Sequence, residues 1–300
     1  MMDPDYDLFM AIVAAGSLSG AGRTMRISPA MASKRLSRLE ERLGTRLVHR
    51  STRRLALTAQ GQQLHADLEG VMSALAEAER RVAGDTALPS GPLRISAPTS
   101  FGRLHLAPHI GAFLSAHPRV DFMLDLSDDF ADLMGGTLDL AIRITDQAPA
   151  GMTAHHLADN ARVLCAAPSY IAAHGAPQQL ADLGDHRLLA ATGQLPWRLS
   201  GPKAMVQHHG VSHVRTNSSE VVRELALSGV GIALRSLWDV HRELASGALI
   251  RVLPQIGGAR GIAIYALHPP MPVLPPALAA FIAFLKDLYA PVPPWERTGR

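Results

Sequence analysis

Cysteine is nearly absent from this 300-residue chain, and long apolar runs are absent altogether. The single Cys165 excludes an internal disulfide and is consistent with a reducing compartment. No apolar run approaches the roughly 20 residues that a membrane helix needs, so no membrane contact is expected. The acidic segment Met1–Asp7 lacks a basic region followed by an apolar one, which argues against a secretory signal. These absences predict a cytoplasmic protein.

The motifs of common enzyme and metal sites are also missing. There is no Gly-x-Ser-x-Gly nucleophile elbow, and Gly229-Val-Gly231 lacks the third glycine of a dinucleotide-binding loop. Histidines cluster at His155-His156, His208-His209 and His213, but without the carboxylate or cysteine spacing of a metal site. Cys165 lies in an apolar stretch and is predicted to be a small core residue. The sequence therefore predicts no catalytic residue, no metal and no cofactor.

The charge that is present gathers at one end of the chain. Apolar residues make up 47% and charged residues 18%, which describes a globular chain with room for two or three domains. The net charge is only +3, but residues 1–60 hold ten Lys and Arg against five acids, so the remaining 240 residues sum to −2. Clustered positive charge is typical of a nucleic-acid-binding module, although an ordinary basic surface is the alternative.

The basic end contains a helix with a marked start at Ser28. Ser28 can cap the helix, and Pro29 occupies the first helical position, where proline is best tolerated. The helical period places an apolar side at Met31, Leu36, Leu39 and Leu43. The remaining surface carries Ser33, Lys34, Ser37 and Arg38. A face of hydroxyls and cations suits the major groove of DNA, whereas a solvated surface helix is the alternative.

The segments on either side of this helix complete a DNA-binding pattern. A first helix is predicted at 5–15 and a short second helix ends near Met25, so that the helix at Ser28 follows a tight turn. After it, 46–50 and 54–58 predict two short strands around a basic turn. This hairpin is interpreted as a wing whose Arg50, Arg53 and Arg54 meet phosphates or the minor groove. A plain solvated hairpin is the alternative.

A long helix is predicted from Ala59 to about Ala83. Apolar residues recur along it with the heptad spacing, at Leu64, Leu68, Val71, Leu75, Ala78 and Val82. Such a narrow stripe buries little against a small domain, so pairing with a second copy is favoured over packing within one chain. The sequence does not decide between a homodimer and a homotetramer. The segment 84–92 has the composition of a linker.

Beyond this linker, predicted strands alternate with predicted helices, which is typical of parallel α/β sheets. The strands are expected at 93–97, 121–126, 138–144, 162–166, 211–216, 230–234 and 261–267. The helices are expected at 103–116, 129–135, 168–174, 218–228, 236–246 and 275–289.

The stretch Ser28–Gly61 resembles the DNA-binding segment of LysR-type transcriptional regulators. The matching features include Ser33 in mid-helix, Leu39-Glu40, Leu43-Gly44, Arg50, and Leu57-Thr58 leading to Gly61. The resemblance extends over nearly the whole chain, because 91–98, 101–108 and 228–234 are similar to the effector domain of that family. This sequence departs from the family pattern at Gly22, at Val48, and at Pro29, which replaces a common glutamine.

The resemblance implies an N-terminal all-α winged helix-turn-helix with a long linker helix, followed by a C-terminal α/β periplasmic-binding-protein-like domain. The implied domains are 1–58 for DNA binding, 59–90 for the dimerisation helix and hinge, and 91–300 for effector binding. Within the last, subdomain I covers about 91–161 and 268–292, and subdomain II about 162–267. The implied partners are double-stranded promoter DNA, a small-molecule effector and further copies of the chain.

The candidate site residues follow from this architecture. The DNA contacts are expected at Ser28, Pro29, Ala30, Ser33, Lys34, Arg35, Arg38, Arg50, Arg53 and Arg54. Ligands of open parallel sheets lie beyond the carboxyl ends of the strands, often against helix N-termini, so loops from both subdomains should converge on one cleft. The effector contacts are expected at Thr99, Ser100, Phe101, Ser127, Asp128, Arg143, Thr145, Thr216 and Asn217. Helix capping is the alternative for each hydroxyl.

The function predicted from these features is DNA-binding regulation controlled by a small polar or carboxylated metabolite. A transport-type solute-binding protein would share the fold of the C-terminal two-thirds, but the basic N-terminal module and the missing signal sequence argue against it. An enzyme fused to a DNA-binding domain would need a catalytic constellation that the sequence does not contain.

Overall fold

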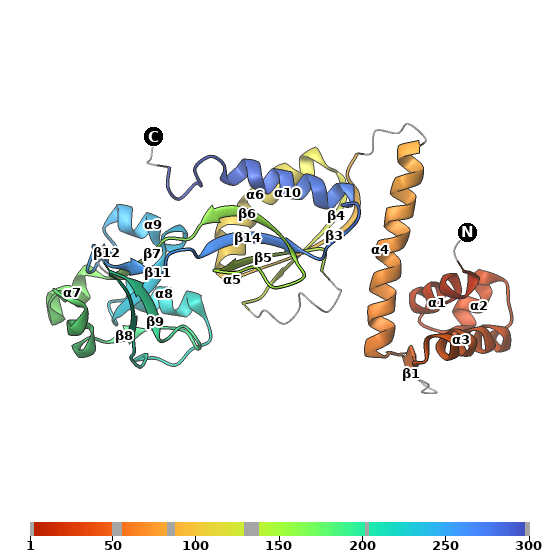
Figure 1. Ribbon diagram of the computed structural model, residues 1–300, viewed down its shortest axis with the longest axis horizontal. Helices are drawn as coiled ribbons and strands as arrows, with labels where there is room; N and C mark the ends of the chain where they lie inside the picture. The colour runs from red at the N-terminus through yellow and green to blue at the C-terminus, as the bar shows by residue number, and fades with distance from the viewer. Residues whose placement is uncertain (1–2, 50–55, 83–87, 129–137, 202–203, 298–300) are drawn as a thin grey trace.

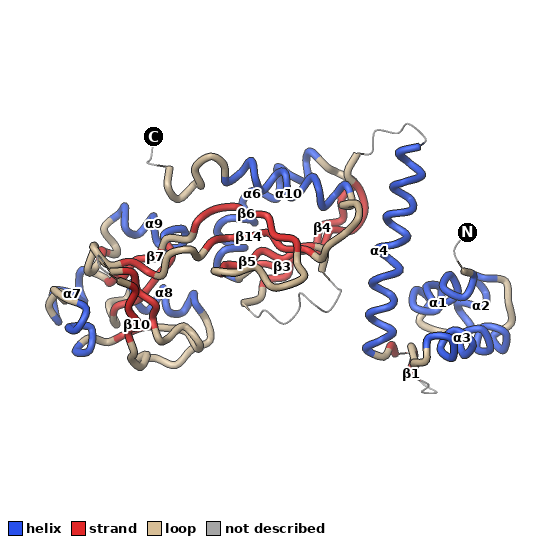
Figure 2. The backbone as a smooth tube through the Cα atoms, viewed as in Figure 1, coloured by secondary structure: helices blue, strands red, loops and turns tan. Residues whose placement is uncertain are grey.

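The computed structural model describes residues 3–49, 56–82, 88–128, 138–201 and 204–297. A three-helix N-terminal unit is followed by one long helix and then by two separate β-sheets with helices packed outside them (Figures 1 and 2). None of the described helices has the length and apolarity needed to cross a membrane.

The N-terminal unit consists of α1 (Pro4–Ala15), α2 (Leu18–Met25) and α3 (Pro29–Leu43). Local signals set the boundaries of these helices. The Ser28 hydroxyl accepts the Met31 backbone N–H at 3.1 Å, Pro29 opens α3, and Gly44 closes it in the left-handed conformation. The unit has its own apolar core, in which Leu8, Phe9, Ile12, Leu36 and Leu39 are buried. The predicted helix-turn-helix is therefore present as a packed unit.

The buried side of α3 differs from the predicted one. Ala32, Leu36, Leu39 and Glu40 are buried, whereas Met31 is 48% exposed and Leu43 is 38% exposed. Glu40 occupies a core position because its carboxylate accepts the backbone N–H groups of Leu47 and Val48, at 2.8 and 3.2 Å. The prediction of Met31 and Leu43 on the buried apolar side was wrong. The hydrophobic period also could not identify Glu40 as buried, because a buried glutamate depends on its hydrogen-bond partners.

The wing is a short antiparallel hairpin of β1 (Val48–His49) and β2 (Ala56–Leu57), which pairs Val48 with Leu57 and His49 with Ala56. The predicted strands were longer. The basic tip with Arg50, Arg53 and Arg54 lies outside the described residues.

Helix α4 (Ala59–Val82) begins after Thr58, whose hydroxyl accepts the Gly61 backbone N–H at 3.0 Å. The heptad stripe has two different environments. Leu64 and Leu68 pack onto the core of the N-terminal unit, whereas Val71 and Leu75 are 55% and 45% exposed. Among the described side chains of the stripe, Val71 and Leu75 are thus available to a second copy, so the interpretation of the whole stripe as a dimer seam was too broad.

The first sheet has the strand order β4-β3-β5-β14-β6. Its strands are β3 (Ser90–Ala97), β4 (Arg119–Leu126), β5 (Leu140–Thr145), β6 (Thr153–Asp159) and β14 (Ala263–His268). Strand β3 runs parallel to β4 and β5, whereas β14 runs antiparallel to β5 and β6. Residues of α6 (Ala107–Ala116) and α10 (Pro276–Tyr289) pack into the core of this sheet.

The second sheet has the order β10-β9-β13-β7-β11-β8, and β12 also pairs with β7. Its strands are β7 (Arg162–Ala166), β8 (Leu188–Leu189), β9 (Trp197–Ser200), β10 (Met205–His208), β11 (Ile232–Ser236), β12 (Ile250–Arg251) and β13 (Gly257–Gly258). Its helices are α7 (Pro168–His174), α8 (Ser219–Leu227) and α9 (Leu237–Ser246), with a 3₁₀ turn at Leu180–Asp185.

Several expectations for the C-terminal part need correction. Both sheets are mixed rather than parallel, since β7 also runs antiparallel to β11. Strand β14 belongs to the first sheet, so the chain returns to subdomain I before Ala263 and not near residue 268. The segment 211–216 forms only an isolated bridge, between Ser212 and Leu188. Strands β6, β8, β9, β10, β12 and β13 were not predicted, and the predicted helix at 129–135 lies outside the described residues.

Candidate functional site

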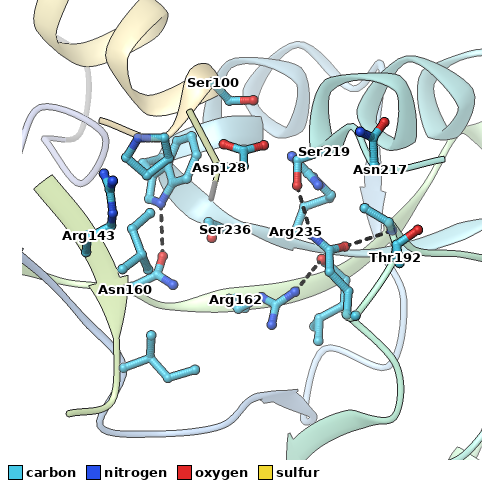
Figure 3. Close-up of a pocket in the computed structure, with 18 residues that line it drawn as sticks. Ser100, Asp128, Arg143, Asn160, Arg162, Thr192, Asn217, Ser219, Arg235 and Ser236 are labelled. Atoms are coloured by element: carbon cyan, nitrogen blue, oxygen red, sulfur yellow. Dashed lines mark hydrogen bonds between the residues drawn. The ribbon is translucent and has the colours of Figure 1, made fainter. Parts of the chain in front are cut away.

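A cavity of about 480 Å³ lies between the two sheets (Figure 3). Its walls come from both, because the loops after β3 and β4 and the end of β5 meet the ends of β7 and β11 and the loops after β8 and before α8. The volume falls in the range of small-molecule sites. The polar and charged side chains around it are Ser100, Asp128, Arg143, Asn160, Arg162, Thr192, Gln194, Asn217, Ser219, Arg235 and Ser236.

The two places where the chain crosses between the sheets form one side of the cavity. Asn160 lies on the first crossing, Arg162 directly follows it at the start of β7, and Ile262 lies on the second crossing. The Asn160 backbone N–H donates to the Ile262 carbonyl at 2.9 Å, which ties the two crossings together. The Asn160 side chain accepts the indole N–H of Trp238 at 3.0 Å, so Asn160 is held both by the second crossing and by α9.

Three arginines surround the cavity, and they differ in how their charge is compensated. Arg235 is buried and paired with Asp239, with 2.7 Å between Nε and Oδ2. Arg143 is buried and donates to the Ile142 carbonyl and the Ser96 hydroxyl, at 2.8 and 3.0 Å.

Arg162 lacks a carboxylate partner among the described residues. Its Nη2 donates to the Leu234 carbonyl at 3.1 Å. Burial and the nearby Arg235 lower the pKa of Arg162 to about 10, so its guanidinium stays charged at neutral pH. A charged group in this position favours an anion in the cavity.

Ser100 provides a second unsatisfied group. Its side chain is buried at 3% exposure, and its hydroxyl oxygen has no hydrogen-bond partner within the described part of the chain. Ser100 comes from subdomain I and Arg162 from the first strand of subdomain II. Buried polar atoms are normally satisfied, so a hydroxyl without a partner that lines a cavity is suited to a bound ligand.

The backbone donor expected beside Ser100 is already occupied. The Thr99 N–H donates to the Asp128 carboxylate at 2.9 Å. This N–H group is therefore not free for a ligand, although a free N–H group was expected at this helix N-terminus. Asp128 itself lines the cavity and adds a negative charge to the wall that Ser100 belongs to.

The nine predicted effector residues thus divide into two groups. Ser100, Asp128, Arg143 and Asn217 line the cavity. Thr99, Phe101, Ser127, Thr145 and Thr216 are absent from its lining. The Thr145 hydroxyl donates to the Gln147 carbonyl in a turn, and the Thr216 carbonyl accepts from the backbone and the hydroxyl of Thr192. These polar groups stabilise loops.

Phe101 is fully buried in an aromatic cluster behind the cavity wall. It packs against Trp238, His105, Tyr289 and Trp295, with ring centroids 5.3 to 6.1 Å apart. His105 lies in a π-helical turn, Gly102–Leu106, between Ser100 and α6, and its Nε2–H donates to the Trp238 carbonyl at 2.9 Å. Burial lowers the pKa of His105 to about 4, so the ring is neutral at pH 7.

Sequence reasoning missed the cavity residues of the chain crossings and of the second sheet. The residues missed are Asn160, Arg162, Thr192, Gln194, Ser219, Arg235, Ser236 and Trp238. A charged residue at the start or end of a strongly apolar strand was the available signal for Arg162, next to Val163–Ala166, and for Arg235, next to Ile232–Leu234.

On α3 the side chains predicted to contact DNA are in part engaged within the protein. Ser28, Pro29, Ala30 and Lys34 are exposed and Ser33 is half-buried. By contrast, Arg35 and Arg38 both bind the buried Asp5 carboxylate of α1.

This cluster is compact. Arg35 Nε lies 2.7 Å from Oδ1 of Asp5, and Arg38 donates from Nε and Nη2 to Oδ2 at 3.0 and 2.6 Å. The Arg35 side chain is only 19% exposed, whereas Arg38 is 70% exposed. Arg42 is paired with Asp3 in the same way. Arg35 thus stabilises the packing of α3 on α1, and the carboxylates of Asp3 and Asp5 offset much of the positive charge that the sequence assigned to α3.

The groups that enzyme or metal hypotheses would need are poorly placed. Cys165 is fully buried, and burial raises the pKa of its thiol to about 12. Within the described ranges no three His, Cys, Asp or Glu side chains gather as a metal site would require.

Comparison with known proteins covers both parts of the chain. Residues 5–62 match the family model described as bacterial regulatory helix-turn-helix protein, lysR family, and residues 86–290 match the LysR substrate binding domain. Among curated relatives, the HTH-type transcriptional regulator DmlR of Escherichia coli K12 is 34% identical over 84% of this chain and 83% of its own. The HTH-type transcriptional activator TtdR of the same strain is 36% identical over 87% and 86%.

A solved structure with similar coverage is that of CrgA, a LysR-type transcriptional regulator from Neisseria meningitidis. It is 28% identical, covers 96% of this chain and 98% of its own, and has a TM-score of 0.62. The relatives are regulators of transcription, which excludes the transport-type and enzymatic alternatives. Together with the helix-turn-helix unit and the cavity between two α/β subdomains, these matches show that the chain belongs to the LysR family of DNA-binding transcriptional regulators, which bind promoter DNA and small-molecule effectors and form oligomers.

Proposed function

We propose that this regulator responds to a small anionic metabolite, in the first place a carboxylate, bound in the cavity between the subdomains. The main support is the Arg162 guanidinium, which lines the cavity without a carboxylate partner among the described residues. The unsatisfied Ser100 hydroxyl is the second support, because it would accept or donate a hydrogen bond from the opposite subdomain. A ligand held by both residues would bridge the two subdomains and so favour one arrangement of them.

Calorimetry with a panel of small carboxylates and their uncharged amides tests this proposal. We expect carboxylates to bind and amides to fail, and Arg162→Gln to weaken binding by about 10- to 100-fold, the loss of a charge-assisted hydrogen bond. Ser100→Ala should weaken it less. Arg251→Gln is the matched control, since Arg251 is exposed on β12 and does not line the cavity. Equal affinities for wild type and Arg162→Gln would refute the proposal.

For DNA binding we propose that the exposed face of α3 reads the operator through Ser33 and Lys34, with Ser28, Pro29, Ala30 and Arg38 beside them. The wing residues Arg50, Arg53 and Arg54 are proposed as phosphate or minor-groove contacts. Arg35 is proposed to act through the fold, because its guanidinium is held by Asp5. Acting on promoter DNA would place the protein in the cytoplasm.

Operator binding measured at several salt concentrations separates these roles. Lys34→Ala and Ser33→Ala should cost sequence preference, on the order of 1–3 kcal/mol per lost base contact. Arg53→Ala should weaken binding to all sequences and reduce the salt slope. Wild-type behaviour of all three variants would rule out this assignment.

A further inference from the structure

Two ion pairs join the subdomains at the rim of the cavity. On one side, Arg103 Nε lies 2.8 Å from Oε1 of Glu220. Arg103 belongs to the π-helical turn that follows Ser100, and Glu220 lies in the first turn of α8 beside Ser219. Both Ser100 and Ser219 line the cavity, whereas Arg103 and Glu220 do not. The pair therefore connects the two walls without belonging to the binding surface.

The second pair connects other elements of the same two subdomains. Arg198 Nη1 on β9 lies 2.9 Å from Oδ2 of Asp146, which directly follows β5. Asp146 comes shortly after Arg143 and Ile144, both of which line the cavity. In the described part of the chain, these two are the ion pairs that cross between the subdomains.

The covalent connections leave the subdomains a way to move. The chain crosses at 160–161 and again at 259–262, and the hydrogen bond from Asn160 to Ile262 holds the two crossings side by side. Two adjacent crossings form a hinge, about which one sheet can tilt relative to the other. The packing of Trp238 from α9 against Phe101 and His105 of subdomain I, together with the contacts across the rim, then decides how far the cavity opens.

We propose that Arg103–Glu220 and Arg198–Asp146 are clasps that hold the subdomains closed over the cavity and so set the affinity for the effector. This inference rests on the proposed ligand site, but the clasps themselves are a property of the free protein. Their side chains are 33% to 55% exposed, so each clasp is weak and sensitive to salt. Weak clasps suit a sensor, because the closed form is favoured without being locked.

The opening of the free protein tests the clasps without any ligand. Spin labels at Ser115→Cys on α6 and Ser246→Cys on α9 would report the distance between the subdomains, in labelled chain diluted with unlabelled chain. The native Cys165 is buried and should stay unlabelled. We expect Arg103→Glu to shift the distances toward a more open population, and Arg103→Glu with Glu220→Arg to restore the wild-type distribution. High salt should act like the single variant.

Glu224→Gln is the matched control, because it removes an exposed carboxylate from the same helix as Glu220. Among the described residues, the Glu224 carboxylate pairs only with the neighbouring Arg223. Its distances should equal those of wild type. Unchanged distances in Arg103→Glu, or a charge-swapped pair that fails to restore them, would overturn the proposal.

Affinity provides the second readout. For a carboxylate that binds wild type, Glu220→Gln should weaken binding about two- to fivefold, the effect of an exposed ion pair, while Glu224→Gln leaves it unchanged. Equal affinity for Glu220→Gln and wild type would overturn the link between clasps and sensing. If no carboxylate binds wild type, the proposed ligand class fails, and the distance measurement still decides whether the clasps exist.

Discussion

The Asp5 carboxylate offers a sharp way to separate folding from DNA recognition in the N-terminal unit. It is 3% exposed and accepts three hydrogen bonds from Arg35 and Arg38, residues that sequence alone assigns to DNA. A hydrogen bond to a charged group contributes about 1.5–3 kcal/mol, and removing one member of a buried pair costs about 3–5 kcal/mol. Because Arg38 is mostly exposed, its ion pair with Asp5 contributes only about 0–1 kcal/mol to the stability of the unit.

We therefore expect Asp5→Ala to destabilise the unit by about 2–4 kcal/mol, Arg35→Ala by about 1–3 kcal/mol, and Arg38→Ala by less than about 1 kcal/mol. All three tryptophans lie beyond residue 190, so their fluorescence does not report this unit. Hydrogen exchange of the amides in α1 and α3 does, since it measures the free energy of local opening.

The dependence of the stability of the N-terminal unit on acid pH should agree with these values. Burial opposes ionisation of Asp5, but the hydrogen bonds from Arg35 and Arg38 hold its pKa below the ordinary value. A lowered carboxyl pKa contributes stability that is present above the unfolded pKa of about 3.9 and is lost as the pH falls through the folded pKa. The protection of α1 and α3 should therefore decline in acid for wild type but not for Asp5→Ala. Native protection in Asp5→Ala, or loss of DNA binding in Arg35→Ala with native protection, would refute the reasoning.

Three further outcomes are expected. Leu75→Glu should lower the oligomer mass in sedimentation while the N-terminal unit stays folded, whereas Leu68→Glu should also unfold it, because Leu68 is buried in that unit; an unchanged mass for Leu75→Glu would show that α4 pairs elsewhere. Arg26→Gly should raise stability by up to about 1 kcal/mol, since Arg26 has a φ of 54°, and lower stability would contradict this. Burial lowers the pKa of His105 from 6.5 to about 4, so His105 contributes about 3 kcal/mol of stability that is fully present above pH 6.5 and is lost as the pH falls to 4. The fluorescence of the adjacent Trp238 should report this loss of stability in acid. In His105→Phe this pH dependence should disappear.

The sequence by itself determined the elements whose signals are local. Ser28 and Pro29 set the start of α3 through groups within one turn, and the structure begins that helix at Pro29 as predicted. The apolar run Val163–Ala166 and the helix after Pro168 were likewise correctly predicted. These features depend on neighbours in sequence, so the tertiary structure adds little to them.

Tertiary structure decided the features that join distant parts of the chain. The order of strands in each sheet, and the return of β14 to the first, depend on pairings across more than 100 residues that leave no periodic signal. The cavity takes Arg162 and Trp238 from elements that its predicted loops did not include. Arg35 looked like a DNA contact until Asp5, 30 residues earlier, was found beside it. The type of a side chain and its position in a periodic pattern can be read from the local sequence. Its partner is set by tertiary packing. That partner determines whether a charged side chain stabilises the fold or is available to bind a ligand.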